Sequence, residues 1–150
     1  MDRSFFRHAV DLSIRNYEID WQGIVHNGNI LLYCEVGRIR YLQDLGLPVT
    51  VDSIQGDSRV VVARNEIDYR SPARFGEPLR VLTRVASIGT TSFTFEGIVE
   101  EAAAGRIIAE NVSVHVWLDK ITGEPVPVPE GFRTLVEKFE GVALAAKKTD

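Results

Sequence analysis

The strongest structural signal in this chain is the segment from residue 17 to residue 42, YEIDWQGIVHNGNILLYCEVGRIRYL. Asp20 lies among apolar and aromatic residues, and a turn is expected at Gly23. The cluster from Asn27 to Asn29 then begins an amphipathic helix, whose free backbone N–H groups and positive dipole end attract negative charge. A carboxylate beside such a helix end suits the hydrolysis of an activated acyl group.

The helix is predicted to run from residue 28 to residue 45, because Gly46 ends the periodic pattern and Pro48 follows it. At 100° per residue one face carries mainly apolar residues, namely Leu31, Cys34, Arg38, Tyr41, Leu42 and Leu45. Glu35 lies at the margin of this face, three residues before Arg38, and the two charges are expected to pair.

Strand patterns occupy most of the rest of the chain. The predicted strands are 5–17, 59–70, 78–88, 91–101 and 105–118, and a second short helix, 132–139, ends at Gly141. The links between successive strands are short, so antiparallel pairing is expected. The sequence therefore predicts an α+β fold in which the long helix packs on one face of an antiparallel sheet.

Composition and length predict a single domain, 1–150, whose tail at about 142–150 is loosely ordered. The net charge of −4 argues against a nucleic-acid partner, and Cys34 is the only cysteine, so no disulfide or thiolate metal site is expected. The histidines have no ligand-spaced partners, so no metal and no cofactor are predicted. Without an apolar run of membrane-spanning length or a signal peptide, the expected location is the cytoplasm.

Three segments together resemble one known family: DWQGIVHNGN from Asp20, EVGR from Glu35, and IDYRSPARFGEPL from Ile67. They are similar to the hot-dog-fold acyl-coenzyme A thioesterases, in particular the 4-hydroxybenzoyl-coenzyme A and Tol–Pal-associated types, over roughly residues 8 to 130. The resemblance implies a five- to six-stranded antiparallel sheet wrapped around the central helix, and a homodimer or homotetramer with active sites between subunits. It places the catalytic aspartate at Asp20 and the helix carboxylate at Glu35.

The chain departs from this family at several positions. Relatives often have an aromatic residue in place of Ile30, a Tyr-His pair at His26-Asn27, and a basic residue in the turn at 88–91 near the coenzyme A phosphates. The expected coenzyme A contacts are therefore Arg74, Ser71 in the same loop, and Thr90 in that turn. The missing basic residue leaves acyl carrier protein open as an alternative to coenzyme A.

The chemistry follows from the residues themselves. A thioester releases a thiol of pKa about 8.5, so the protein must mainly supply an attacking group and stabilise the oxyanion. Asp20 would deprotonate a water or attack directly, while Ile19 and Trp21 would desolvate it. The oxyanion would be bound by the backbone N–H groups of Asn27, Gly28 and Asn29, and His26 is a further candidate beside the carbonyl.

Three functions remain open from sequence, with acyl-coenzyme A hydrolysis the leading one. A hydratase or dehydratase acting on an acyl thioester would need a pair such as His26 and Glu35 for proton transfer. A non-catalytic acyl-thioester-binding module would not need Asp20, although that residue could also simply cap a turn. The sequence does not predict which acyl group is used.

Overall fold

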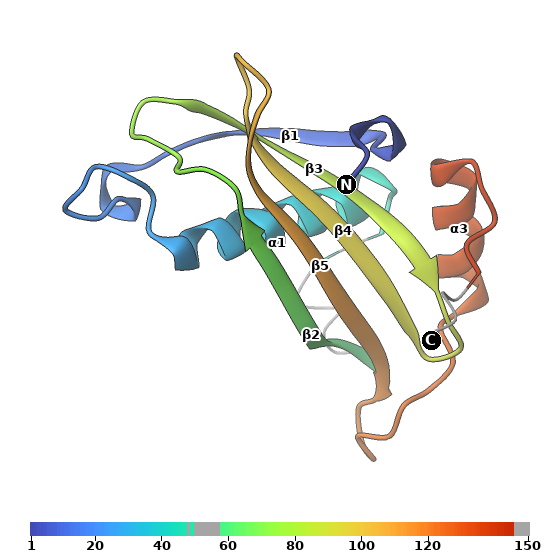
Figure 1. Ribbon diagram of the computed structural model, residues 1–150. Coiled ribbons are helices and arrows are strands. Elements are labelled where there is room, and N and C mark those ends of the chain that lie inside the picture. Colours follow the sequence, from blue (N-terminus) through green and yellow to red (C-terminus); the bar gives the residue numbers. More distant parts are fainter. Residues whose placement is uncertain (48, 50–57, 146–150) are drawn as a thin grey trace.

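The computed structural model describes residues 1–47, 49 and 58–145, and within them one antiparallel sheet carries the fold (Figure 1). Its five strands are β1 (His8–Ser13), β2 (Ser58–Tyr69), β3 (Pro78–Ile88), β4 (Ser92–Glu101) and β5 (Arg106–Asp119). They are arranged in the order β1-β3-β4-β5-β2, and each neighbouring pair is antiparallel. The predicted α+β class and antiparallel sheet are confirmed.

The helices also match the sequence pattern closely. Helix α1 (Asn27–Asp44) follows β1, and α3 (Glu130–Glu140) ends at Gly141, which adopts a φ of 72°. The first predicted strand was too long, because two short 3₁₀ turns, η1 (Arg3–Phe5) and η2 (Asn16–Glu18), flank β1. Pro48 and residues 146–150 lie outside the described residues, and no described helix is long and apolar enough to cross a membrane.

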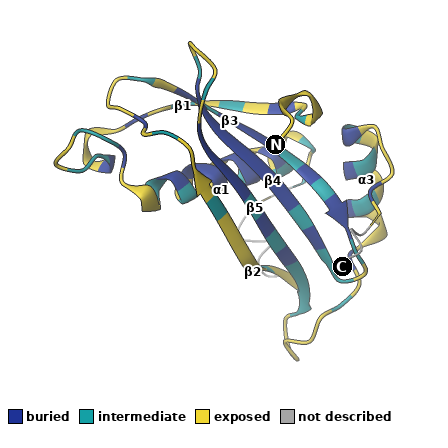
Figure 2. Cartoon of the chain, in the orientation of Figure 1, coloured by how far each residue is buried: buried dark blue, intermediate teal, exposed yellow. Residues whose placement is uncertain are grey.

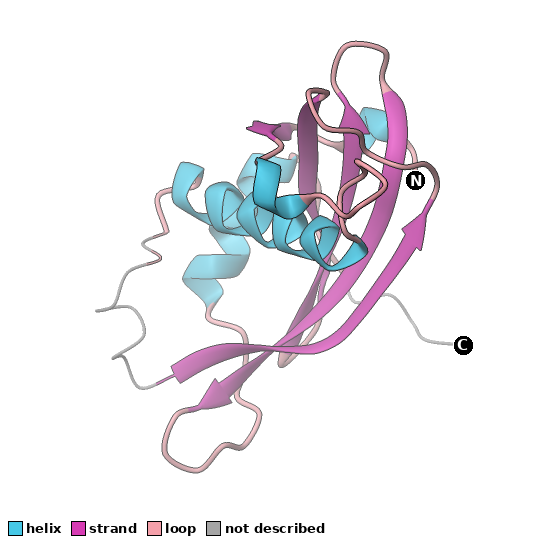
Figure 3. Ribbon diagram, turned by 90° about the vertical axis from the view of Figure 1, so that its left-hand side faces the viewer, coloured by secondary structure: helices cyan, strands magenta, loops and turns pink. Residues whose placement is uncertain are grey.

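Helix α1 lies against the inner face of the sheet, as the side view shows (Figure 3). Its midpoint approaches β3 closely: a Cβ on Gly37 would lie 2.6 Å from Oγ1 of Thr83 and 2.7 Å from Cγ1 of Val81. The sheet bends where registers shift at Val62/Arg64, Val85/Ser87 and Val99/Glu100. The close approach and the bends let the sheet curve around the helix.

The buried face of α1 is rotated from the predicted one. Its buried residues are Ile30, Tyr33, Cys34, Gly37, Arg38 and Tyr41. Leu31, Leu42 and Leu45 are only half-buried, because the adjoining face of the helix, which carries Gly37, lies closest to β3. Cys34 belongs to the core cluster near the start of the helix, and Tyr41 belongs to a second, aromatic cluster near its end.

The edge strand β2 stands out because it is largely exposed, whereas β3 and β4 are mostly buried and β5 is buried or half-buried at all but one residue (Figure 2). Val60 and Val62 on this strand are 41% and 51% exposed. A long edge strand with exposed apolar residues offers unpaired backbone groups to another strand.

Candidate active site

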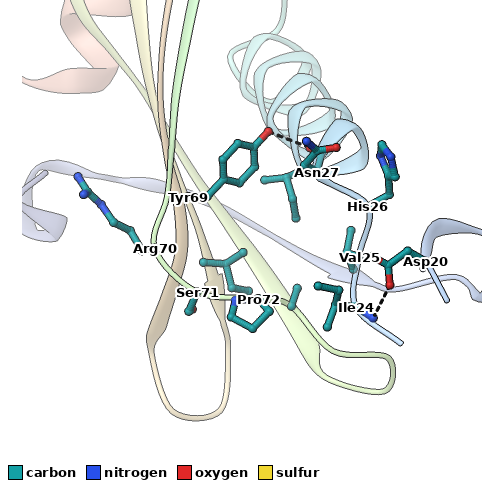
Figure 4. Close-up of a pocket in the computed structure, with 12 residues that line it drawn as sticks. Asp20, Ile24, Val25, His26, Asn27, Tyr69, Arg70, Ser71 and Pro72 are labelled. Atoms are coloured by element: carbon teal, nitrogen blue, oxygen red, sulfur yellow. Dashed lines mark hydrogen bonds between the residues drawn. The ribbon is translucent and has the colours of Figure 1, made fainter. Parts of the chain in front are cut away.

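A cavity of about 520 Å³ opens at the N-terminal end of α1 (Figure 4). We call it the helix-start cavity. It lies between the loop that precedes the helix and the segment that follows β2. Its lining consists of Asp20, Ile24, Val25, His26, Asn27, Ile30, Tyr69, Arg70, Ser71, Pro72, Ala73 and Ile108. The structure thus brings together residues from the two most distinctive sequence segments.

Backbone hydrogen bonds fix the loop that carries Asp20. The N–H of Asp20 donates to the carbonyl oxygen of Ile24 at 2.8 Å, and the N–H of Gly23 donates to the carbonyl oxygen of Asp20 at 3.0 Å. Gly23 adopts a φ of 75°, a left-handed conformation that favours glycine. The N–H of Val25 then donates to the carbonyl oxygen of Ala73 at 2.9 Å, which ties the loop to the opposite wall of the cavity.

The Asp20 carboxylate is held at one oxygen and free at the other. Its Oδ1 accepts from the backbone N–H of Gln22 at 2.7 Å and from that of Ile24 at 3.4 Å. Its Oδ2 has no hydrogen-bond partner among the described residues. Asp20 therefore caps its own turn and still presents one oxygen. The expectation that Trp21 would desolvate it is wrong, because Trp21 is 92% exposed and Asp20 is only half-buried.

Most of the N–H groups predicted to bind the oxyanion already donate to acceptors at the start of α1. The exposed His26 caps the helix, and its Nδ1 accepts from the N–H of Gly28 at 3.2 Å, as does Oδ1 of Asn27 at 2.9 Å. The N–H of Asn29 donates to the carbonyl oxygen of His26 at 2.9 Å. Of the three predicted donors, only the N–H of Asn27 has no acceptor within the described part of the chain.

Tyr69 is a cavity residue that the sequence reasoning missed. It is the last residue of β2, and its side chain reaches from the sheet to the first turn of α1 (Figure 4). The hydroxyl donates to the carbonyl oxygen of Asn27 at 3.1 Å. Its place directly before Arg70 and Ser71 in the IDYRSPAR segment was the available signal.

Glu18 is a second missed residue, and it joins the loop to the helix. Its buried carboxylate accepts from the hydroxyl of Tyr33 at 2.6 Å and from the N–H of Arg15 at 2.7 Å. Burial alone would raise the pKa of Glu18, but these hydrogen bonds hold it below its usual value. Its carbonyl oxygen accepts from the N–H of His26 and from Nδ2 of Asn29. These contacts set the position of Asp20 relative to the helix end.

The predicted coenzyme A residues are not gathered in one place. Ser71 lines the helix-start cavity, but its hydroxyl donates to the carbonyl oxygen of Ile107 and accepts from Arg106. Arg74 is exposed beside the cavity, and its backbone N–H donates to Glu77. Thr90 lies two residues beyond Ile88, the far end of β3, and Ile88 itself is about 33 Å along the strand from Pro78. Within one chain, Thr90 is therefore not part of this site.

A second cavity, of about 490 Å³, lies toward the C-terminal half of α1, and we call it the helix-end cavity. Its lining is mainly apolar and consists of Glu35, Arg38, Ile39, Leu42, Leu47, Val49, Ser58, Arg59, Val60, Val62, Phe93, Phe95, His115, Trp117 and Phe132. Glu35 is thus eight residues, or about 12 Å, along α1 from Asn27 and lines a different cavity from Asp20.

The prediction that Glu35 and Arg38 pair is wrong, because no ion pair joins them in the part of the chain that the structure describes. Glu35 is exposed, whereas Arg38 is only 8% exposed. Nη1 of Arg38 instead donates to Oδ1 of Asn111 at 3.4 Å. The side chains separate because Arg38 turns toward β5, while Glu35 remains at the edge of the buried face.

The described residues contain no group of three or more His, Cys, Asp or Glu side chains placed to hold a metal ion. Cys34 is buried in the core, and burial raises the pKa of its thiol to about 11. Since the thiolate is the form that attacks carbon or binds metal, Cys34 has a packing role.

Comparison with known proteins places this geometry in a family. The Thioesterase-like superfamily matches residues 14–136, most of the chain. A chloroplastic acyl-acyl carrier protein thioesterase of Arabidopsis thaliana is 27% identical over 132 residues, which cover 88% of this chain and 68% of that protein. YneP of Bacillus subtilis (strain 168), a candidate acyl-CoA thioesterase, is 30% identical over 122 residues, covering 81% of this chain and 87% of that protein.

Solved structures agree with the sequence match. A thioesterase from Thermus thermophilus, complexed with coenzyme A and Zn, is 34% identical with a TM-score of 0.78, covering 93% of this chain and 98% of that chain. A 1,4-dihydroxy-2-naphthoyl-CoA thioesterase from Synechocystis shares the fold with a TM-score of 0.81 at 19% identity, over 86% of this chain and 94% of that chain.

The chain belongs to the thioesterase-like superfamily, and its antiparallel sheet with the enclosed helix is the hot-dog fold. It is a thioester hydrolase.

Proposed function

We propose that this single hot-dog domain hydrolyses an acyl-coenzyme A thioester in the helix-start cavity, with Asp20 as the attacking base or nucleophile. The observation that carries the proposal is the state of the Asp20 carboxylate. Oδ1 is fixed by two backbone N–H groups, whereas Oδ2 is without a partner among the described residues at the start of α1. The coenzyme A bound by the Thermus thermophilus thioesterase supports the substrate class.

Asp20 can promote hydrolysis of the thioester by two routes. As a general base it takes a proton from water, the oxygen of water attacks the thioester carbon, and the C–S bond breaks to release the thiolate, which is then protonated. As a nucleophile its Oδ2 attacks the same carbon and expels the thiolate, and water then hydrolyses the resulting anhydride. Both routes need an oxygen of Asp20 that is free to react.

The oxyanion that forms on either route needs a hydrogen-bond donor. Asn27 is the best candidate, because its backbone N–H is unoccupied within the described structure and its carbonyl is fixed by Tyr69. Gly28 and Asn29 would contribute mainly through the helix dipole, since their N–H groups already have acceptors. His26 would place its exposed ring at the mouth of the cavity.

A second copy of the chain would complete the site. Glu35 and Thr90 lie far from Asp20 within one chain, and β2 is an exposed edge strand. Pairing two copies along β2 would bury Val60 and Val62. It would also bring Glu35 and Thr90 of one subunit toward Asp20 of the other subunit. We therefore propose a homodimer or a homotetramer, of the 4-hydroxybenzoyl-coenzyme A or Tol–Pal-associated type, acting in the cytoplasm.

The runner-up substrate is an acyl group on acyl carrier protein, the substrate class named for the Arabidopsis relative. Hydratase or dehydratase chemistry is the alternative on this fold; it would need His26 of one subunit and Glu35 of the other, because the two line different cavities within the chain, and it gives the free oxygen of Asp20 no role. A purely binding role does not explain the unused oxygen of Asp20.

The decisive experiment replaces Asp20 by Asn, which keeps an oxygen acceptor for the turn and removes the base. Thiol release from a panel of short, long and aromatic acyl-coenzyme A substrates should fall by at least about a hundredfold. Asp119→Asn is the matched control, because Oδ1 of Asp119 likewise accepts from two backbone N–H groups, of Ile121 and Thr122, away from the cavity. An Asp20→Asn enzyme as active as the Asp119→Asn enzyme would remove this mechanism.

A further inference from the structure

One arginine holds both ends of the segment from residue 71 to residue 77, the start of which lines the helix-start cavity. Arg106, the first residue of β5, donates from Nη1 to Oγ of Ser71 and to the carbonyl oxygen of Pro72, both at 2.7 Å. Its Nη2 donates to Oε1 of Glu77, also at 2.7 Å. The planar guanidinium presents these N–H groups in a fixed geometry, so it connects the two ends of the segment rigidly.

Glu77 carries this connection into the middle of the segment. Its second oxygen, Oε2, accepts from the backbone N–H of Arg74 at 2.8 Å, and its own N–H donates to the carbonyl oxygen of Arg74 at 3.1 Å. Between the two residues Gly76 adopts a φ of 89°, a left-handed conformation that favours glycine and lets the chain reverse. Both carboxylate oxygens of Glu77 are therefore used, and its pair with Arg106 fixes the backbone of Arg74.

The backbone at Arg74 pairs in turn with the loop that carries Asp20. Arg74 forms an isolated antiparallel bridge with Ile24, next to the hydrogen bond from the N–H of Val25 to the carbonyl oxygen of Ala73 at 2.9 Å. The carbonyl oxygen of Ile24 accepts from the backbone N–H of Asp20 at 2.8 Å. The N–H of Ile24 donates to Oδ1 of Asp20 at 3.4 Å (Figure 4). Ile24 is thus the link between the segment and the carboxylate.

We propose that Arg106 and Glu77, which we call the loop clamp, are positioning residues that fix the Asp20 carboxylate for its reaction through Arg74 and Ile24. Neither residue lines the helix-start cavity, so both act through the backbone and not on the substrate. The inference rests on the proposed function of Asp20. Moving a reacting group by about 1 Å can cost about a hundredfold in rate, so a looser loop should lower turnover measurably.

Steady-state kinetics separate positioning from substrate binding. Arg106→Met removes the guanidinium, and a truncated thioester without the nucleotide keeps the phosphate contact proposed for Arg74 out of the measurement. The turnover number should fall about tenfold, and the Michaelis constant should stay within about twofold. Arg80→Met is the matched control, because Arg80 is 34% exposed against 35% for Arg106 and pairs with Asp11, away from the cavity. Equal turnover numbers in the two variants would overturn the proposal.

A double variant and a lysine variant test whether the two residues act as one clamp. Glu77→Gln should lower the turnover number severalfold, and the double variant with Arg106→Met should be no slower than Arg106→Met alone. Arg106→Lys should recover part of the turnover but stay severalfold below the parent, because one ammonium cannot bind Glu77, Ser71 and Pro72 together. Additive losses, or a lysine variant as fast as the parent, would contradict the clamp. Were Arg106→Met not to fold, Glu77→Gln against Asp11→Asn makes the same comparison.

Hydrogen exchange of backbone amides gives a readout that does not depend on catalysis. In Arg106→Met the N–H of Val25 should exchange at least about tenfold faster, because its acceptor, Ala73, lies in the released segment. The N–H of Val128, which donates to the carbonyl oxygen of Thr90 at 2.8 Å beyond the far end of β3, is the reference and should exchange as in the parent. Unchanged exchange at Val25, or equal acceleration at both amides, would contradict the positioning role.

Asp20→Asn distinguishes failure of this inference from failure of the proposed function. An inactive Asp20→Asn enzyme beside a fully active Arg106→Met enzyme would leave the proposed function in place and remove only the positioning role. An active Asp20→Asn enzyme would remove the proposed function and the inference with it. Loss of turnover in both variants, with faster exchange at Val25 in Arg106→Met, is the result expected.

Discussion

The two ends of α1 are built from different parts of the sequence, and this decides what each can do. At the N-terminal end, consecutive residues fold a turn, a cap and a helix start, leaving polar groups half-exposed in a cavity. At the C-terminal end, the described lining of the cavity comes from α1, three strands and α3, and a buried cation lies among aromatic rings. The first end suits reaction with water, whereas the second suits retention of an apolar molecule.

The largest expected effect concerns His115, which lines the cavity at the C-terminal end of α1. Its pKa is about 4 in the folded protein, below the value of about 6.5 for an exposed histidine, so the unfolded chain binds more protons between these pH values. Stability should therefore be complete above pH about 6.5 and fall as the pH drops toward 4, by up to about 3 kcal/mol from this group. Denaturant titrations of the parent and of His115→Gln between pH 4 and 7.5 measure this loss of stability.

The same titration tests the neighbour that contributes to the shift. Because the Arg38 charge also lowers the pKa of His115, Arg38→Met should reduce the acid destabilisation. A parent and a His115→Gln variant that lose stability in parallel would mean that His115 is not buried as the structure shows.

The second prediction concerns Gly37, at the point where α1 is closest to the sheet and between the two cavities. A methyl group there would lie 2.6 Å from Oγ1 of Thr83, so Gly37→Ala should destabilise the fold by about 2 kcal/mol despite the better helix propensity of alanine. Gly28→Ala is the matched control, since its nearest contact would be an ordinary 3.4 Å. A Gly37→Ala protein with an unchanged melting temperature would show that the helix can move away from β3.

How much could be predicted from the sequence also differs between the two ends. The Asp20 turn and the start of α1 were predictable, because they depend on residues adjacent in the chain. Arg38 was correctly placed on the buried face, but its neighbour Asn111 was not foreseen, because that contact depends on how β5 lies over the helix. Tyr69 and Glu18 were missed for a related reason: a strand end and a loop meet the helix only in the folded chain.

The third prediction sharpens the positioning role of Glu18. Tyr33→Phe removes the hydroxyl that donates to the buried Glu18 carboxylate and should cost about 1.5 kcal/mol of stability. The turnover number should fall severalfold, because the loop that carries Asp20 loses one of its attachments. A loss of stability with an unchanged turnover number would contradict this positioning role of Glu18.

The smallest expected effect concerns the carrier and Arg74. Its side chain has no ion-pair partner among the described residues, since the nearby Glu77 pairs with Arg106. Coenzyme A brings phosphates that a chain of net charge −4 must meet with local cations, so Arg74→Gln should raise the Michaelis constant for acyl-coenzyme A about tenfold. A truncated thioester without the nucleotide should be hydrolysed as before, because it has no phosphates to lose. Equal loss with both substrates would make Arg74 structural, and no loss with either would favour acyl carrier protein as the carrier.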